Sequence, residues 1–225
     1  MKLLNWNICH GGAKNLNAIS EAIAKHNPDV VVLTEFRNGM SGQQLLKNLK
    51  DLGLEHHTKA EALPNDNSVV IASRWIGTDA LIEVPAALQK YVTATKIGDV
   101  TIIGTFCARE DVGKNFFGFL SALQNGYRPK LTLATGDFYF GPKGSNPRNY
   151  NQLQPLWNAG WKDIWKRDNP DKTLWSYRSS AGGVSRPDHI VATEDLAPRI
   201  KRSWYSLNEL DNKLSDHAPM LAEID

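Results

Sequence analysis

The sequence predicts a mixed α/β fold in which helices are interspersed with many short strands. Three observations lead to this prediction. Helical periodicity and strand patterns alternate along the chain, and some apolar runs are continuous, as in strands covered on both faces. Other strands follow each other as hairpins, which favours a mixed sheet over a purely parallel one. The 225 residues show neither internal repeat nor linker, so we expect a single domain over residues 1–225.

The N-terminal half is predicted to begin with a strand, a helix and a second strand. The apolar pattern indicates a strand over residues 3–8 and an amphipathic helix over 15–26. The continuous apolar run over 30–33 is typical of a strand that is buried on both faces. A second helix is expected over 42–52, and further strands over 68–73, 80–84, 91–97 and 100–106.

The C-terminal half continues the alternation. Gly98 and Asp99 are expected to join two strands as a tight hairpin. Along a predicted helix around Gly160, the residues Trp157, Trp161 and Trp165 recur at four-residue spacing, which favours packing on the sheet over base stacking. Helices are expected over 112–124 and 151–166, and strands over 131–135, 173–177, 188–193, 201–205 and 219–224.

Composition and charge restrict the function only weakly. The apolar share of 41% and the charged share of 22% are those of an ordinary globular protein. Because the formal net charge is only +2, any affinity for nucleic acid must come from local basic patches. Cys9 and Cys107 are too few for a disulfide framework and lack zinc-site spacing, so both are expected to be buried strand residues.

The sequence contains no apolar run near the roughly 20 residues that span a bilayer. Its N-terminus has neither the charged region nor the apolar core of a secretion signal. We therefore expect a cytoplasmic protein without a membrane partner, and a monomer by default.

Several predicted strands end in carboxylates, amides or histidine rather than in residues that merely stop a strand. Polar groups at strand ends gather at one rim of a sheet, where binding and catalytic sites are usually built. Each group alone is a weak indication of a functional site, and only the set as a whole supports one. Its members are Asn5-Trp6-Asn7, Thr34-Glu35, Gly136-Asp137, Pro187-Asp188-His189 and Ser215-Asp216-His217.

This set of side chains suits the hydrolysis of a phosphodiester. Glu35, Asp216 and an asparagine oxygen are hard ligands that favour Mg²⁺ or Mn²⁺ over Zn²⁺. Asp137 can position or deprotonate the attacking water, and His217 can contact the phosphate as a cation or act as an acid.

The ordered series of motifs resembles the endonuclease/exonuclease/phosphatase superfamily, which includes exonuclease III, the abasic-site endonucleases and deoxyribonuclease I. The resemblance extends from residue 4 to residue 224 and implies a four-layer α/β/β/α sandwich with two mixed sheets face to face and helices outside. The motifs are Leu4-Asn5-Trp6-Asn7-Ile8, Val32-Leu33-Thr34-Glu35, Thr135-Gly136-Asp137-Phe138, Arg186-Pro187-Asp188-His189 and Ser215-Asp216-His217-Ala218-Pro219.

The resemblance also implies roles for individual residues. Asn7 and Glu35 match the metal-binding positions of the family, and Asp216 matches a supporting ligand. Asp137 matches the aspartate that orients or activates the attacking water. His217 matches the phosphate-contacting histidine, and Asp188 matches the carboxylate that fixes this histidine.

Two departures from the family pattern stand out. The family usually has asparagine two positions after the catalytic aspartate, where this chain has Tyr139, whose hydroxyl would donate from further out. The segment ending in Phe106 lacks the histidine common in deoxyribonuclease-like members and resembles the abasic-endonuclease and exonuclease III branch. Tyr139 is therefore retained as a catalytic candidate in place of the missing amide.

Each site residue also has a structural interpretation. Glu35 could be an ordinary strand-end carboxylate, Asn7 a turn-capping amide and Asp137 a turn residue after glycine. Asp188 and His217 could form a purely structural pair, and His189 is expected to be a neighbour of the site. Among the basic loop residues Arg109, Lys143, Arg148 and Arg178, Arg109 is the candidate substrate contact because it closely follows Phe106.

The leading hypothesis is a Mg²⁺- or Mn²⁺-dependent nuclease that hydrolyses the phosphodiester bonds of DNA or RNA. An alternative with the same chemistry is a phosphatase or phosphodiesterase acting on a small phosphorylated ligand. A third hypothesis is a catalytically weakened binding module, which only the Tyr139 departure supports.

Overall fold

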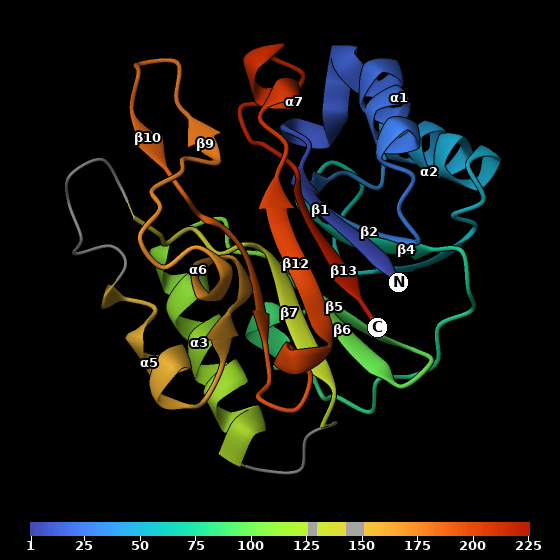
Figure 1. Cartoon of the computed structure of the whole chain (residues 1–225). Helices are drawn as coiled ribbons and strands as arrows, with labels where there is room; N and C mark the ends of the chain where they lie inside the picture. The colour runs from blue at the N-terminus through green and yellow to red at the C-terminus, as the bar shows by residue number, and fades with distance from the viewer. Residues whose placement is uncertain (126–129, 143–150) are drawn as a thin grey trace.

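Two β-sheets lie face to face at the centre of the computed structural model, which describes residues 1–125, 130–142 and 151–225 (Figure 1). The first sheet has six strands in the order β12 (Ile200–Tyr205), β13 (Met220–Ile224), β1 (Lys2–Asn7), β2 (Val30–Phe36), β4 (Ser68–Ser73) and β3 (His56–Lys59). The second sheet has five in the order β5 (Val92–Ile97), β6 (Val100–Phe106), β7 (Thr132–Asp137), β11 (Asp188–Ala192) and β8 (Lys162–Asp163).

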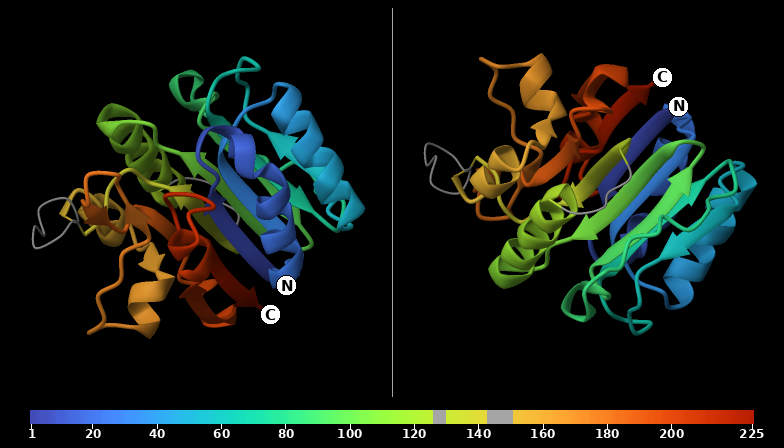
Figure 2. Two further views of the ribbon diagram at one scale, coloured as in Figure 1. Left: turned by 90° about the horizontal axis from the view of Figure 1, so that it is seen from above. Right: turned by 90° about the horizontal axis from the view of Figure 1, so that it is seen from below.

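Helices α1 (Leu16–His26) and α2 (Met40–Asp51) cover the outer face of the first sheet (Figure 2). Alternate residues of β1, such as Leu4 and Trp6, point to this face and pack against apolar residues of both helices, among them Ile19 and Leu45. A 3-10 helix, η1 (His10–Asn15), leads from β1 into α1. The burial of one apolar stripe on each helix is what holds this layer to the sheet.

The outer face of the second sheet is covered by α3 (Glu110–Asn125), with α5 (Gln154–Asn158) beside it (Figure 1). α6 (Ile164–Asp168) packs against β11 of this sheet and β12 of the first sheet. Phe116 of α3 packs edge-on against Phe138, which follows β7. Two shorter elements complete the described chain, the hairpin of β9 (Tyr177–Arg178) and β10 (Val184–Ser185), and α7 (Asn208–Asp211). The expected four-layer sandwich of the mixed α/β class is confirmed.

Strand direction brings the polar strand ends together. β1 runs parallel to β2, and β6 runs parallel to β7, so the ends carrying Asn7, Glu35 and Asp137 reach the same rim of the sandwich. β11 runs antiparallel to β7, and its first residue, Asp188, lies opposite Asp137.

The strand expected over residues 80–84 is wrong. Only Thr78 in this region pairs with β5, through an isolated bridge to Lys96. Leu81 has a positive φ of 53° and donates its N–H to the Asp79 side chain, 2.8 Å away. This local side-chain turn replaces strand pairing, and the apolar pattern reflects packing of a loop.

The single helix expected over residues 151–166 is also wrong, because α5 ends before Gly160 and β8 separates it from α6. Gly160 adopts a φ of +89°, which terminates the helix, and Asp163 then caps α6 by accepting from the backbone of Lys166. Trp161 and Trp165 are buried in the core as predicted, but not on one helical face.

Two smaller differences concern strands. The strand expected over residues 173–177 is reduced to Tyr177–Arg178, and β3 was not predicted because its histidines and lysine hide the strand pattern. Within the described residues, no helix combines the length and apolarity required to cross a bilayer.

Candidate active site

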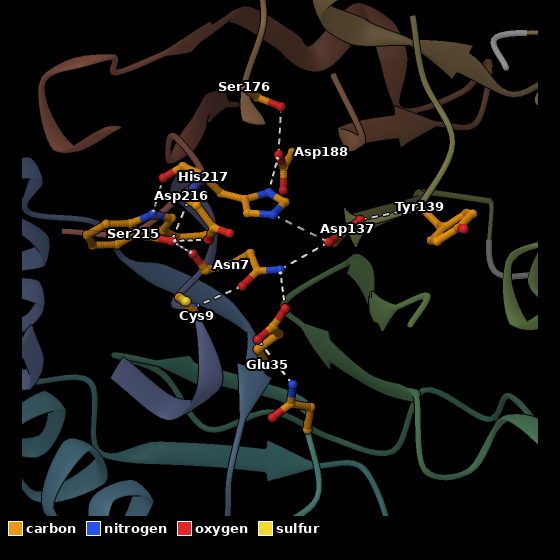
Figure 3. A network of polar contacts seen from close by, with 12 residues as sticks. Asn7, Cys9, Glu35, Asp137, Tyr139, Ser176, Asp188, Ser215, Asp216 and His217 are labelled. Atoms are coloured by element: carbon orange, nitrogen blue, oxygen red, sulfur yellow. Dashed lines mark hydrogen bonds and ion pairs between the residues drawn. The ribbon is translucent and has the colours of Figure 1, made fainter. Parts of the chain in front are cut away.

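A cavity of about 370 Å³ opens at the rim where the polar strand ends meet. Its lining includes Glu35, Asp137, Tyr139, Asp216 and His217 (Figure 3). Two further predicted residues, Asn7 and Asp188, are fully buried and bond to these lining groups. The structure therefore brings seven of the eight predicted site residues together.

Asn7 links the two sheets at the floor of the site. Its Nδ2 donates to Glu35 Oε1 at 3.2 Å and to Asp137 Oδ2 at 3.0 Å, and its Oδ1 accepts from the backbone N–H of Cys9 at 3.0 Å (Figure 3). The amide thus holds two carboxylates, one from each sheet, on the same side of the cavity.

Asp137 lies at the end of β7 behind a glycine that the fold requires. A Cβ on Gly136 would lie 1.8 Å from the carbonyl oxygen of Thr105, so the strand can approach β6 only with glycine there. Burial raises the pKa of Asp137 to about 6, with the positive charge of His217 opposing this shift. The backbone N–H of Tyr139 donates to Asp137 Oδ1 at 2.9 Å and fixes the carboxylate.

His217 is oriented by a buried carboxylate. Its Nδ1 lies 2.9 Å from Asp188 Oδ2, which also accepts from Ser176 Oγ at 2.6 Å, and its Nε2 lies 3.9 Å from Asp137 Oδ2 (Figure 3). Burial by itself lowers the pKa of His217, but the negative charges of Asp188, Asp137 and Asp216 raise it to about 9. The imidazole is therefore a cation at neutral pH.

Strained backbone clusters around the cavity. Cys9, His10, Glu35 and Tyr139 have positive φ values of 52°, 53°, 56° and 65°. Such conformations are unfavourable for residues other than glycine and persist where the surrounding structure enforces them, typically at functional sites.

Two groups of side chains are candidates for holding a metal ion. Asp137, Asp188 and His217 have potential ligand atoms within 4.8 Å of one another. However, Asp188 is already bound to His217, and a protonated imidazole does not coordinate a cation. The carboxylates of Glu35 and Asp216 line the cavity and are hard-oxygen groups that fit Mg²⁺ or Mn²⁺. Asn7, the third predicted ligand, turns its Nδ2 toward Glu35 and its Oδ1 toward the Cys9 backbone, so in this arrangement it orients Glu35.

The other residues considered in the sequence analysis do not line this cavity or lie outside the described part of the chain. Arg109 lies at the exposed start of α3, with its guanidinium bound to Asp111 and to the hydroxyl of Tyr91. His189 is fully buried and contacts Asp163 and the backbone of Phe140, so it is a neighbour of the site, as expected. Lys143 and Arg148 lie outside the described residues.

The expectation that both cysteines are buried strand residues is wrong. Cys107 is buried but follows β6 rather than lying within it, and Cys9 follows β1 and is only half-buried. Burial and the nearby charges of Asp216 and Glu35 raise the pKa of Cys9 to about 11, so its thiol is protonated at neutral pH.

Sequence reasoning missed several supporting contacts. Ser176 bonds to Asp188, and the Tyr177 ring packs 4.7 Å from the His217 ring between centroids. Ser215 Oγ donates to the backbone of Asn7 and accepts from the backbone N–H of His217, which ties the last motif to the first. Only Ser215, which lies within a motif, gave a signal in the sequence.

Comparisons with known proteins identify the family of this chain. The model of the Endonuclease/Exonuclease/phosphatase family matches residues 4–217. A search of curated proteins found no match.

Solved structures share the fold at low identity. A 3'-5' exonuclease from Neisseria meningitidis is 22% identical with a TM-score of 0.80, and 100% of each chain is covered. A Neisseria 3' phosphatase bound to product DNA hairpin is 22% identical with a TM-score of 0.79, covering 100% of this chain and 99% of the other. An AP endonuclease from Archaeoglobus fulgidus is 16% identical with a TM-score of 0.82, covering 100% and 99%. Because the family model matches nearly the whole chain, the protein belongs to the Endonuclease/Exonuclease/phosphatase family.

Proposed function

We propose that this protein is a Mg²⁺- or Mn²⁺-dependent nuclease that hydrolyses phosphodiester bonds in DNA. The observation that supports this proposal is the single cavity in which the carboxylates of Glu35 and Asp216 lie beside Asp137 and a cationic His217. Hard-oxygen ligands, a carboxylate base and a buried cation are the groups required to neutralise a phosphate and activate water.

The residues of the site divide the reaction between them. Asp137, held by Asn7 and by the backbone of Tyr139, orients the attacking water and accepts its proton. As the new bond from water oxygen to phosphorus forms, the bond from phosphorus to the leaving sugar oxygen breaks. That oxygen takes up a proton from solvent water, and Asp137 later returns the proton of the attacking water to solvent. His217 donates from Nε2 to a non-bridging phosphate oxygen, with its ring fixed by Asp188.

A divalent cation held by Glu35 and Asp216, with Glu35 oriented by the Asn7 amide, would neutralise charge on the phosphate as a Lewis acid. Tyr139 occupies the position of the family asparagine, and its exposed ring lines the cavity. We assign its hydroxyl to a contact with the phosphate or the neighbouring sugar.

A polymeric substrate is favoured by a second cavity of about 760 Å³, which shares Tyr177 and Asp216 with the first. Its lining includes the basic residues Lys14, Arg178 and Lys213. Because this space continues from the proposed site of cleavage, it can accept the chain on one side of the scissile phosphate.

A phosphatase is the second candidate, since one structural neighbour is a 3' phosphatase bound to a DNA product. The same groups would attack a terminal phosphate monoester, and the second cavity would then hold the strand that bears it. Both candidates require nucleic acid in the second cavity, whereas a small phosphorylated ligand would leave that cavity empty.

Turnover with Mg²⁺ on plasmid, single-stranded, abasic-site and 3'-phosphorylated DNA tests the proposal. We expect Glu35→Ala to lower turnover by about 100-fold or more, because the cation loses its charged ligand. Glu61→Ala, in an exposed loop residue, is the matched control. If Glu35→Ala retains Mg²⁺-dependent turnover, the proposed metal site is wrong, and if the wild type turns over none of these substrates, a binding module is favoured.

A further inference from the structure

Asn67, one residue before β4, contacts Glu35 from the side opposite Asn7. Its Nδ2 lies 3.1 Å from Glu35 Oε2 and 3.0 Å from His10 Nδ1. Its Oδ1 accepts from Arg37 Nε at 2.6 Å. The resemblance to the family assigns no role to Asn67, which lies outside every motif of the sequence.

Arg37 determines which way the Asn67 amide faces. A guanidinium has only donors, so the amide must present its oxygen to Arg37 and its two N–H groups to Glu35 and His10. His10 Nδ1 lies 3.1 Å from Arg37 Nη2 and 3.0 Å from Glu35 Oε2, so this ring stands between the guanidinium and the carboxylate. The orientation of Asn67 is therefore fixed by charge-assisted bonding and does not depend on Glu35.

Glu35 is a residue that requires such support. Its φ is 56°, and the pairing of β2 with β4 shifts register between Thr34 and Phe36. This bulge takes Glu35 out of the regular ladder, so β-sheet pairing alone does not hold its flexible side chain in one position. The carboxylate is instead held by N–H donors on both oxygens, from Asn7 on Oε1 and from Asn67 and the His10 backbone on Oε2.

We propose that Asn67, oriented by Arg37, is a positioning residue that holds Glu35 in place to receive the divalent cation. This inference rests on the proposed function of Glu35 as a metal ligand. Groups that orient a ligand in this way typically change metal affinity by roughly 10–100-fold when they are removed.

The test is Mn²⁺ binding to the purified full chain, measured by isothermal titration calorimetry without substrate. We expect Asn67→Ala to weaken Mn²⁺ binding by about 10-fold, because Glu35 loses the amide that holds Oε2. Asn38→Ala is the matched control, since Asn38 bonds to Gln43 of α2 and Lys59 of β3 and not to Glu35. Thermal unfolding of both variants verifies that they are folded.

Arg37→Ala provides a second, independent variant. It should weaken Mn²⁺ binding less than Asn67→Ala, and the double variant should bind no more weakly than Asn67→Ala alone, because Arg37 acts through Asn67. Additive losses would overturn the role given to Arg37.

The possible failures are distinguishable. Unchanged Mn²⁺ affinity in Asn67→Ala, together with lost binding in Glu35→Ala, would overturn the positioning role and leave the proposed function standing. Unchanged binding and turnover in Glu35→Ala would instead remove the metal site on which both proposals depend.

Discussion

At the residue scale, Asp137 and His217 act as an oppositely charged pair whose two pKa values lie on either side of neutrality. The proposed reaction needs Asp137 ionised and His217 protonated. We therefore predict that kcat/KM is highest between about pH 6 and pH 9, with a limb falling below and a limb falling above this range.

The sign of each limb follows from the charge that is lost. Acidification through a pKa of about 6 protonates Asp137 and removes the base, and a bound divalent cation moves this limb to lower pH. Alkalinisation through a pKa of about 9 neutralises His217. A rate profile over roughly pH 5 to 10 at saturating Mg²⁺ checks the prediction, and a rate that keeps rising past the upper limb would contradict it.

Asp188→Asn tests the source of the raised His217 pKa. Because Asp188 supplies the nearest negative charge and a hydrogen bond at 2.9 Å, its loss should lower the pKa of His217 and shift the alkaline limb to lower pH. We expect turnover at neutral pH to fall by about 100-fold. Ser176→Ala, which keeps the carboxylate, should leave the limb much closer to its original position, and equal shifts in both variants would argue against this assignment.

The sequence indicated the principal polar residues because they belong to motifs at strand ends. Ser176, Tyr177 and Asn67 gave no comparable signal, since each is recognised only through a partner that folding brings close from another segment. Such contacts depend on the three-dimensional approach of strands and turns, which local residue patterns do not specify.

At the element scale, the parallel pairing of β6 with β7 depends on Gly136. We predict that Gly136→Ala lowers the free energy of unfolding by about 3 kcal/mol, because the added Cβ meets a backbone carbonyl and the φ of +148° disfavours any side chain. Urea denaturation measures the change. Gly118→Ala in α3, where an added Cβ meets nothing within 4 Å, is the matched control and should be neutral or slightly stabilising.

Element prediction succeeded where an apolar pattern had one interpretation and failed where a single residue changed the backbone. The helices α1, α2 and α3 and most strands followed their periodicity. By contrast, the positive φ values of Leu81 and Gly160 ended a predicted strand and a predicted helix. Propensity does not reveal these breaks, because side-chain turns and tertiary packing decide them.

At the scale of the whole molecule, the two adjoining cavities predict a binding surface for a strand of nucleic acid. Replacement of Lys14 or Lys213 by Glu should weaken DNA binding. Each replacement should also lower the slope of log DNA affinity against log salt concentration by about one, the effect of losing one phosphate contact. Fluorescence anisotropy across a salt series measures this slope. Lys47→Glu, on an exposed position of α2, is the control, and an identical loss in that variant would indicate only a general charge effect.

Hydrolysis of a small phosphodiester such as bis(4-nitrophenyl) phosphate should be unchanged in the Lys14 and Lys213 variants, because it fills only the smaller cavity.

The four-layer architecture was predictable through the resemblance of the motif series to a known family. The second cavity was not, because it is formed by the segment after β1, the β9–β10 hairpin and the segment between α7 and β13, whose relative placement no motif records.

The order of strands in the first sheet has a consequence for folding. β13 lies between β12 and β1, and the backbone amine of Met1 bonds to the carbonyl of Ile224. His217 and Asp216 immediately precede this strand. Because β1 carries Asn7 and pairs with β13 on one side and β2 on the other, this sheet closes only when two segments more than two hundred residues apart in the sequence come together. Such long-range pairing is slow to form, so we expect the site to be complete only late in folding.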